Sequence, residues 1–239
     1  MLRIVHTADC HLDAPCASLD AGVRERVRAA EREAFARVCS LAIEREAHAL
    51  VIAGDVFERS EAGPAALHHV LAQLARVTES GIAVVIASGN HDPGRALAPL
   101  AQAGCTLALT HEPVTVELKD ADGELRGHIV AIGHSGTGES ANLAQLLPPA
   151  PSAASVAVLH AQVDGATGAR ERYAPCTPED LDRGYAYWRS GMSICASRCA
   201  PRLPRTTPAV SRRTTSASPA PRARSSSRST PPGVPRSSS

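Results

Sequence analysis

Three polar clusters, each placed directly after an apolar run, constrain this chain more than any other feature. The runs are 2–6, 49–53 and 82–87, and the helical periods between them, 23–47 and 64–80, predict a β-α-β-α-β unit. Such a unit forms a parallel sheet with right-handed crossovers. Because the carboxyl ends of parallel strands lie along one edge of a sheet, the three clusters are expected to meet there.

The side chains at these strand ends form a set that can bind metal ions. In chain order they are Asp9, His11, Asp55, Asn90, His91, Asp92 and, at the end of a further apolar run over 155–160, His160. Carboxylate and amide oxygens mixed with imidazole nitrogens suit divalent Mn, Fe or Zn better than copper(I) or an iron–sulfur cluster. A carboxylate between two such ligand sets can bridge two cations, which hold a phosphate and activate a bound water. His134, which follows another apolar run, is a weaker candidate for the same site.

Each motif taken alone has a structural alternative, because Asp-x-His is common and because Gly, Asn and Asp favour turns. Their order at the ends of three consecutive strands makes a purely structural explanation the less favoured one. Further strands are predicted over 105–109, 114–118, 128–132 and 185–188, with a turn at Asp122–Gly123. The predicted fold class is therefore α/β.

The composition changes after Trp188. The segment 189–239 holds ten Arg and no acidic residue, so it carries +10, whereas the remaining 15 basic and 24 acidic residues give 1–188 a net charge of −9. Ser, Pro and Thr fill this segment, and it lacks the large apolar residues that would offset its ordering entropy. We therefore predict a folded domain over 1–188 and a disordered tail over 189–239.

The sequence also bears on the compartment in which the protein works. No apolar run is long enough to cross a bilayer, and the first residues lack the apolar core of a signal peptide. The seven cysteines are odd in number and form no Cys-x-x-Cys pair, which is typical of reduced thiols rather than of a disulfide framework or a zinc site. We expect a cytoplasmic protein with no membrane partner.

The polar clusters resemble the motifs of the calcineurin-like metallophosphoesterases. Asp9-Cys10-His11, Gly54-Asp55 and Gly89-Asn90-His91-Asp92 match the D-x-H, G-D and G-N-H-D motifs of that family. The longer stretches 6–15 and 54–57 are similar to those of bacterial SbcD-like nuclease subunits and related DNA-repair exonucleases.

The resemblance covers 1–188 and implies a layered α-β-β-α sandwich, truncated in this chain, with two divalent metal ions, manganese before iron or zinc. It also implies a role for each residue: Asp9 and His11 bind the first metal, Asp55 bridges both, Asn90 and His160 bind the second, and His91, oriented by Asp92, contacts the phosphate and protonates the leaving oxygen. A histidine held beside a phosphate is a suitable general acid near neutral pH. DNA is the implied substrate, an SMC-like ATPase subunit the implied partner, and a homodimer a further expectation.

One family motif, Gly-His-x-His, is absent, because no His follows His160. Its expected place reads Ser190-Gly191-Met192-Ser193-Ile194. If the third codon bases are C or G, as in a GC-rich gene, shifting the reading frame by one base lets the codons from Ser190 onward be read as Leu-Gly-His-Val-His-Leu-Arg-Gln, and one lost G after the Trp188 codon is sufficient. The same shift reads 224–233 as Leu-Leu-Val-Glu-Val-Asp-Pro-Pro-Gly, an apolar strand followed by a turn. We therefore predict a frameshift, to which a natural Ser/Arg-rich tail is the alternative.

The predicted function is metal-dependent phosphodiester hydrolysis, as a DNA exonuclease or endonuclease of a repair system. We expect this activity to be impaired, because Met192 and Ile194 stand where the missing motif has its two imidazoles. A thioether is a poor ligand for these cations, and an alkyl group is none. Two alternatives stay open: a phosphoesterase for small nucleotides or phosphoproteins, and an inactive truncated product.

Overall fold

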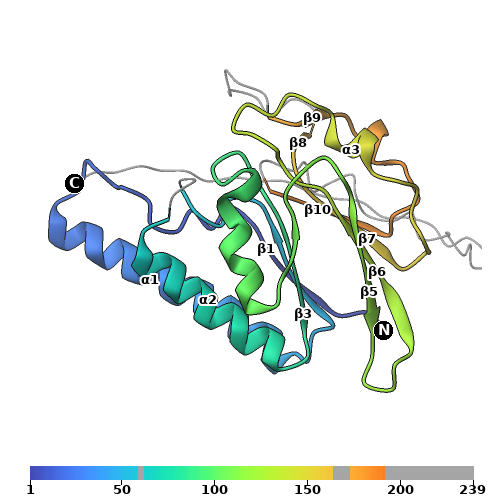
Figure 1. Ribbon diagram of the computed structural model, residues 1–239, viewed down its shortest axis with the longest axis horizontal. Helices are drawn as coiled ribbons and strands as arrows, with labels where there is room; N and C mark the ends of the chain where they lie inside the picture. Colours follow the sequence, from blue (N-terminus) through green and yellow to red (C-terminus); the bar gives the residue numbers. More distant parts are fainter. Residues whose placement is uncertain (59–61, 164–172, 192–239) are drawn as a thin grey trace, which may run out of the picture. The chain divides into compact units, whose positions relative to one another are not determined.

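The computed structural model describes residues 1–58, 62–163 and 173–191, all within one compact unit that spans Met1–Pro201. Two four-stranded sheets lie face to face, with long helices outside the first sheet and shorter elements outside the second (Figure 1). This arrangement is the α-β-β-α sandwich that the family resemblance implied, and the α/β fold class is confirmed.

Four parallel strands form the first sheet. They are β1 (Ile4–Thr7), β2 (Ala49–Ala53), β3 (Ala83–Ala87) and β4 (Thr106–Ala108), and they lie in the order β1-β2-β3-β4. The register pairs Thr7 of β1 with Ile52 of β2, and Ile52 with Ile86 of β3. The carboxyl ends of the first three strands therefore lie along one edge, as predicted.

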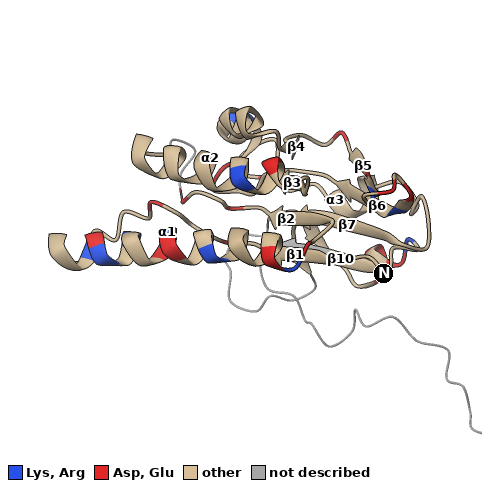
Figure 2. Ribbon diagram, turned by 90° about the horizontal axis from the view of Figure 1, so that it is seen from below, with Lys and Arg blue, Asp and Glu red and all other residues tan. Residues whose placement is uncertain are grey.

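Two helices cover the outer face of this sheet, α1 (Ala21–Glu44) and α2 (Pro64–Glu79). They lie side by side in Figure 1, and in Figure 2 the blue and red bands of basic and acidic residues recur along α1. Pro64 begins α2, because its fixed φ suits the first helical turn and its missing N–H needs no partner there. The apolar faces of both helices pack against alternate residues of β2 and β3, chiefly Leu50, Ile52, Val84 and Ile86.

The second sheet has three parallel strands and one antiparallel strand. They are β5 (Val114–Lys119), β6 (Leu125–Ala131), β7 (Ser155–His160) and β10 (Tyr187–Gly191), in the order β10-β7-β6-β5. Strands β5 and β6 form an antiparallel hairpin across the predicted turn, where Gly123 has a φ of +82°. Parallel pairing joins β6 to β7 and β7 to β10.

Strand β10 corrects one boundary of the sequence analysis. The strand was predicted to end at Trp188, with an irregular tail starting at Arg189. In the structure Arg189 to Gly191 continue the strand and pair with Val158 to His160 of β7. Ladder pairing with an existing strand outweighs the weak β propensity of Arg, Ser and Gly here. The rest of the predicted tail, 192–239, lies outside the described residues.

The core between the sheets follows from strand alternation. In β2 the residues Ala49, Val51 and Ala53 point away from the helices and toward the second sheet, where they meet Ile129 of β6 and Val158 of β7. Successive side chains of a strand point to opposite faces, so a strand buried on both faces reads as an unbroken apolar run. This explains why β2 is apolar and buried throughout.

One of the smaller elements packs on the first sheet beside α2, and the others lie on the outer side of the second sheet. The first is a 3₁₀ helix, η1 (Gly94–Ala103). The others are α3 (Leu143–Leu146), the paired strands β8 (Gln162–Val163) and β9 (Pro175–Cys176), and the 3₁₀ turn η2 (Glu179–Leu181). Leu143, Leu147 and Trp188 close a third apolar cluster against Val130 and Leu159.

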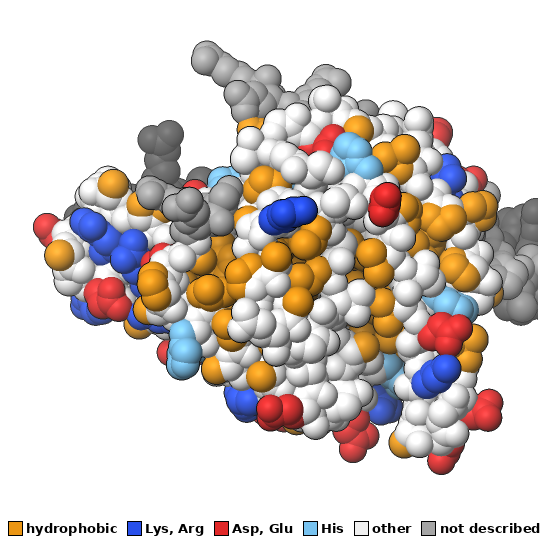
Figure 3. Space-filling model, in the orientation of Figure 1, with side chains coloured by type: hydrophobic (Ala, Val, Ile, Leu, Met, Phe, Trp, Pro, Cys, Tyr) orange, Lys and Arg blue, Asp and Glu red, His pale blue; other side chains and the backbone are white. Residues whose placement is uncertain are grey.

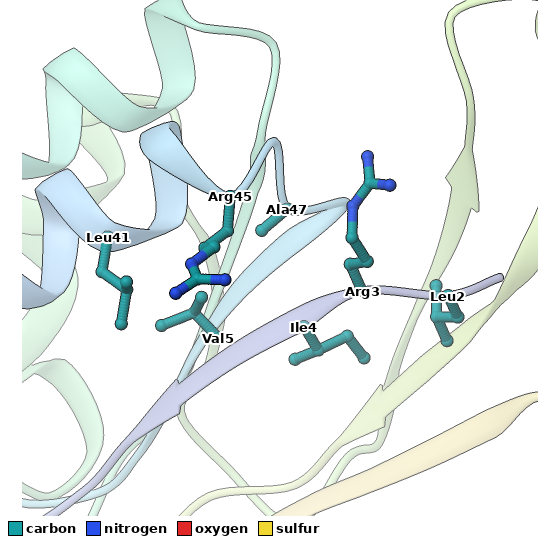
Figure 4. A pocket seen from close by; sticks show the side chains of 7 residues that line it. All are labelled: Leu2, Arg3, Ile4, Val5, Leu41, Arg45 and Ala47. Atoms are coloured by element: carbon teal, nitrogen blue, oxygen red, sulfur yellow. The ribbon is translucent and has the colours of Figure 1, made fainter.

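A shallow pocket lies at the outer edge of the first sheet. Leu41 of α1 and Arg45, the residue that follows α1, face Ile4 and Val5 of β1 across it, and Arg3 lies at its margin (Figure 4). Among the strands that the structure describes, β1 pairs only with β2, so it is an edge strand of the first sheet. In the part of the chain that the structure describes, no helix combines the length and apolarity needed to cross a membrane.

Candidate metal centre

The predicted site residues converge where the strands of both sheets end. Backbone hydrogen bonds extend the pairing of β1 and β2 into the loops that follow them. The amide of Asp9 donates to the carbonyl oxygen of Gly54 at 3.2 Å, and the amide of His11 donates to that of Asp55 at 3.0 Å. The third loop joins them, because the amide of His91 donates to Oδ1 of Asp55 at 3.0 Å. These bonds place the three motifs side by side.

The backbone of these loops adopts conformations that ordinary residues avoid. Asp9, His11 and Asp55 have φ values of 51°, 45° and 52°, in the left-handed region. Such conformations cost free energy in non-glycine residues and persist where the surrounding structure holds them for a function. Strain at three of the predicted ligands, and at neighbouring Asp13 with a φ of 65°, agrees with a functional site.

Two glycines of the motifs lie so close to neighbouring residues that a side chain would not fit. A Cβ atom at Gly54, whose φ is +85°, would overlap the ring of His160. A Cβ atom at Gly89 would overlap the carboxylate and the amide of Asp55. Both glycines therefore allow His160 and Asp55 to approach the backbone of the neighbouring loop.

The ring of His160 brings the second sheet into the site. Its Nδ1 donates to the carbonyl oxygen of Ala53 at 2.9 Å, which directs Nε2 toward the predicted ligands. Nε2 lies 3.1 Å from Oδ2 of Asp55 and 3.2 Å from Oδ1 of Asn90. The lone pairs of Nε2 of His160, Oδ2 of Asp55 and Oδ1 of Asn90 thus face one another in a buried place. A proton or a metal ion between these atoms removes their electrostatic repulsion.

Burial and charge act in opposite directions on this pair. Burial alone raises the pKa of Asp55, but the hydrogen bond and the charge of His160 lower it below the usual value. Burial alone lowers the pKa of His160, but the Asp55 carboxylate raises it above the usual value. Each group therefore favours the charged form of the other.

Two groups of potential metal ligands share Asp55. One consists of His11, Asp55 and His91, and the other of Asp9, Asp55 and His160, with donor atoms within 4.8 Å of one another in each. A carboxylate common to two donor sets is the arrangement that bridges two cations. Oxygen and imidazole donors also fit the divalent ions predicted from the sequence. The grouping differs from the predicted one, which placed Asp9 with His11, and the assignment of ligands to each metal stays a prediction.

The Asp92 carboxylate accepts hydrogen bonds from the backbone of two loops of the site. Its Oδ2 accepts a hydrogen bond from the amide of Phe57 at 3.1 Å, and its Oδ1 accepts one from the amide of Gly89 at 3.1 Å. Burial raises the pKa of Asp92 to about 6, although these amides lower it. The carboxylate therefore joins the second and third loops. The Nδ1 atom of His91 lies 3.0 Å from the carbonyl oxygen of Glu58, and the orientation of His91 by Asp92 stays a prediction.

His134, the weaker candidate, lies behind the donor groups. Its fully buried ring donates from Nε2 to the carbonyl oxygen of His160 at 2.7 Å. The two rings meet edge to face at 5.5 Å. Burial lowers the pKa of His134 to about 4, so the ring is neutral near neutral pH. It supports the backbone of His160, and it belongs to neither donor group.

Glu58 is a site residue that the motifs did not indicate. It follows Gly54–Phe57 directly, and its Oε2 lies 2.8 Å from Nδ1 of His11. Its carbonyl oxygen lies 3.0 Å from Nδ1 of His91. Only its position one residue beyond a motif could have drawn attention to it, because a single Glu in a loop is otherwise unremarkable in a sequence.

The fold and the donor groups are those of an α/β sandwich protein whose centre suits two metal ions. A family model for calcineurin-like phosphoesterases matches residues 2–124, just over half of the chain. The chain belongs to this family, whose members are metal-dependent hydrolases with two-metal sites. The matched region contains all predicted ligands except His160.

A curated protein shows similarity over part of the same region. It is the DNA double-strand break repair protein Mre11 of Methanopyrus kandleri, with 34% identity over 91 residues. That segment is 38% of this chain but only 19% of the relative. The similarity agrees with the predicted likeness to the repair-nuclease branch of the family.

Proposed function

We propose that this chain derives from a two-metal phosphodiesterase that cleaves DNA. The observation that carries the proposal is the sharing of Asp55 between two groups of metal ligands at the strand ends. Cations held there would bind the scissile phosphate and supply an activated water as nucleophile. The similarity to a DNA double-strand break repair protein supports DNA over small nucleotides or phosphoproteins as substrate.

Within this proposal His91 acts as the general acid. Its Nδ1 contacts the carbonyl oxygen of Glu58, so the proton for the leaving oxygen would come from Nε2. When water attacks phosphorus, the bond from phosphorus to the leaving oxygen breaks, and that oxygen takes up the proton. Asp92 contributes indirectly, because it joins the loop of His91 to the loop of Asp55.

The missing Gly-His-x-His motif is the main reason to expect weak activity. Strand β10 ends at Gly191, which is paired with His160 at the end of β7. The chain therefore leaves β10 at the same edge as the ligands, and this supports placing the two absent imidazoles at Met192 and Ile194. Both residues lie outside the described part of the chain. We attribute their identity to the predicted loss of one base after the Trp188 codon.

Partners and location are extensions of the same proposal. An SMC-like ATPase subunit and a homodimer would suit a repair nuclease, and so would a cytoplasmic location and manganese as the metal. On the face shown in Figure 3, acidic and basic side chains are mixed, with no extended basic area. DNA binding by this region would then depend on cations at the site, because 1–188 carries a net charge of −9.

The test is to express the chain as it stands and a version with the lost base restored. Manganese-dependent hydrolysis of duplex DNA and of a small phosphodiester is measured for both, with His91→Gln in the restored version as control. We expect the restored protein to cleave DNA, the present chain to be much weaker, and the control to lose activity. Cleavage of the small substrate alone would favour the second enzyme class, and equal activity of the two versions would contradict the proposed ligands.

A further inference from the structure

Glu58 contacts three other parts of the site through three different groups. Its amide donates to the carbonyl oxygen of Leu12 at 3.1 Å, which continues the pairing of the first two loops. Its carbonyl oxygen accepts from Nδ1 of His91 at 3.0 Å. Its carboxylate oxygens lie 2.8 Å from Nδ1 of His11 and 3.6 Å from Nδ1 of His91.

We propose that Glu58 is the positioning residue that orients both imidazoles of this half of the site, His11 through its carboxylate and His91 through its main chain. This inference rests on the proposed function, because it concerns the same metal centre. It assigns a role to a residue outside the three motifs.

The physical reason lies in the two nitrogens of the imidazole ring. A neutral ring that donates from Nδ1 to an acceptor leaves the lone pair of Nε2 available for a cation. Carboxylates that accept from the outer nitrogen of a metal-ligating histidine fix the tautomer and the ring orientation. In His11 the carboxylate of Glu58 faces Nδ1, whereas Nε2 lies 3.9 Å from Oδ2 of Asp55, the shared ligand.

The contact with His11 has the distance of an ion pair, although the ring nitrogen lacks the alignment of a hydrogen bond. The side chain of Glu58 is 29% exposed, so rotation about its own bonds can bring an oxygen into line. The rings of His11 and His91 meet edge to face, with centroids 4.7 Å apart and an angle of 86°. The two rings therefore pack directly against each other.

The carboxylate of Glu58 contacts His11, whereas its carbonyl oxygen contacts His91, so substitution of the side chain removes only the first contact. Glu58→Leu removes the carboxylate but keeps the carbonyl oxygen that contacts His91. Glu58→Gln keeps an acceptor oxygen near His11 without the charge. Glu33→Leu is the matched control, because Glu33 is an exposed residue of α1 that pairs with Arg37.

The first readout needs neither metal nor substrate. Nitrogen-15 spectra of the imidazole rings, recorded on the full metal-free chain, distinguish the two neutral tautomers of each histidine. We expect Glu58→Leu to change the tautomer preference of His11 but not that of His91, and Glu58→Gln and Glu33→Leu to leave both unchanged. If Glu58→Leu fails to fold, Glu58→Ala removes the same carboxylate with less apolar surface. An unchanged His11 tautomer in a folded variant that lacks the carboxylate would overturn the proposal.

The second readout is the affinity of the full chain for Mn²⁺, measured by electron paramagnetic resonance of the free ion. Loss of an orienting carboxylate lowers metal affinity by about 10–100-fold, so we expect that loss in Glu58→Leu and most of the affinity back in Glu58→Gln. A loss as large in Glu58→Gln as in Glu58→Leu would show direct ligation instead and overturn the positioning role. A changed tautomer in a protein without hydrolytic activity would refute the proposed function and leave the role of Glu58 standing.

Discussion

Nε2 of His160 lies 3.1 Å from Oδ2 of Asp55, and this contact joins the carboxyl edges of the two sheets. Both side chains are almost fully buried, with exposed fractions of 0% and 2%. A buried pair of this kind is favourable only when charges and hydrogen bonds are well matched. The pair therefore ties the region matched by the family model, which contains Asp55, to the second sheet beyond it, which contributes His160.

Removal of the shared carboxylate should abolish metal binding at both donor groups. We expect Asp55→Asn to lower the affinity of the full chain for Mn²⁺ by at least about 100-fold, more than the loss of an orienting residue costs. Isothermal titration calorimetry measures the affinity and the stoichiometry. Asp182→Asn, a change of an exposed carboxylate in the loop before β10, serves as control. Retention of one metal with unchanged affinity would contradict the shared role of Asp55.

A methyl group at Gly89 should disturb the site and the fold together. Because it would overlap Asp55, we expect Gly89→Ala to lower the free energy of unfolding by about 1–3 kcal/mol and to weaken Mn²⁺ binding. Gly22→Ala, in the first turn of α1, is the control. Its Cβ would meet no atom within 4 Å, so we expect the free energy of unfolding to rise by up to about 1 kcal/mol. Urea titrations compare the two variants with the parent chain, and equal stabilities would argue against the close approach.

Burial of neutral His134 should make the fold sensitive to acid. The pKa of this ring is about 4 in the folded protein against 6.5 for an unperturbed His, so the unfolded chain binds its proton first as the pH falls. Stability from this group is therefore present above pH 6.5 and lost toward pH 4, by up to about 3 kcal/mol. The raised pKa of Asp92, about 6, acts in the opposite sense in part of this range.

Comparison of His134→Gln with the parent chain isolates the contribution of His134 to the pH dependence of stability. His134→Gln keeps an N–H donor for the carbonyl oxygen of His160 but cannot be protonated in this range. We expect its free energy of unfolding, measured by urea titration of the metal-free protein, to fall less than that of the parent chain between pH 7 and pH 4. Parallel pH profiles of the two proteins would show that the His134 ring does not titrate as its burial implies.

Most of the first sheet, and the grouping of polar side chains at its carboxyl edge, could be predicted from the sequence because the signals are local. An apolar run followed by a polar cluster marks both the strand and its carboxyl end, as in 49–53 followed by Asp55. The same logic located His160 in a different sheet, although nothing in the sequence indicated that its Nδ1 bonds to Ala53. Contacts of this kind depend on how two sheets pack, which no local pattern encodes.

The features that were missed depend on tertiary structure. The end of β10 is set by pairing with β7, and Arg189 and Ser190 have no strand signal of their own. The helix η1 contains Pro99, which masked its helical period. Glu58 is recognisable only from its distances to His11 and His91.

The last prediction concerns the two positions after β10. If the family motif belongs there, Met192→His with Ile194→His in the present chain should return one imidazole to each metal. We expect the double variant to bind Mn²⁺ at least about tenfold more tightly than the parent, since even indirect supports of a metal site are worth that much. The pairing of Gly191 with His160 is the physical reason, because residues that follow the two strands leave the sheet at the same edge.

Two controls separate coordination from packing. Met192→Leu with Ile194→Val changes the same positions without adding a ligand, and it should leave Mn²⁺ affinity unchanged. The double histidine variant combined with Asp55→Asn should bind as weakly as Asp55→Asn alone, because added imidazoles cannot replace a carboxylate common to both donor groups. A gain that persists in the absence of the Asp55 carboxylate would mean that the new histidines bind metal elsewhere. In that case the loss of Gly-His-x-His would not explain the expected weak activity of this chain.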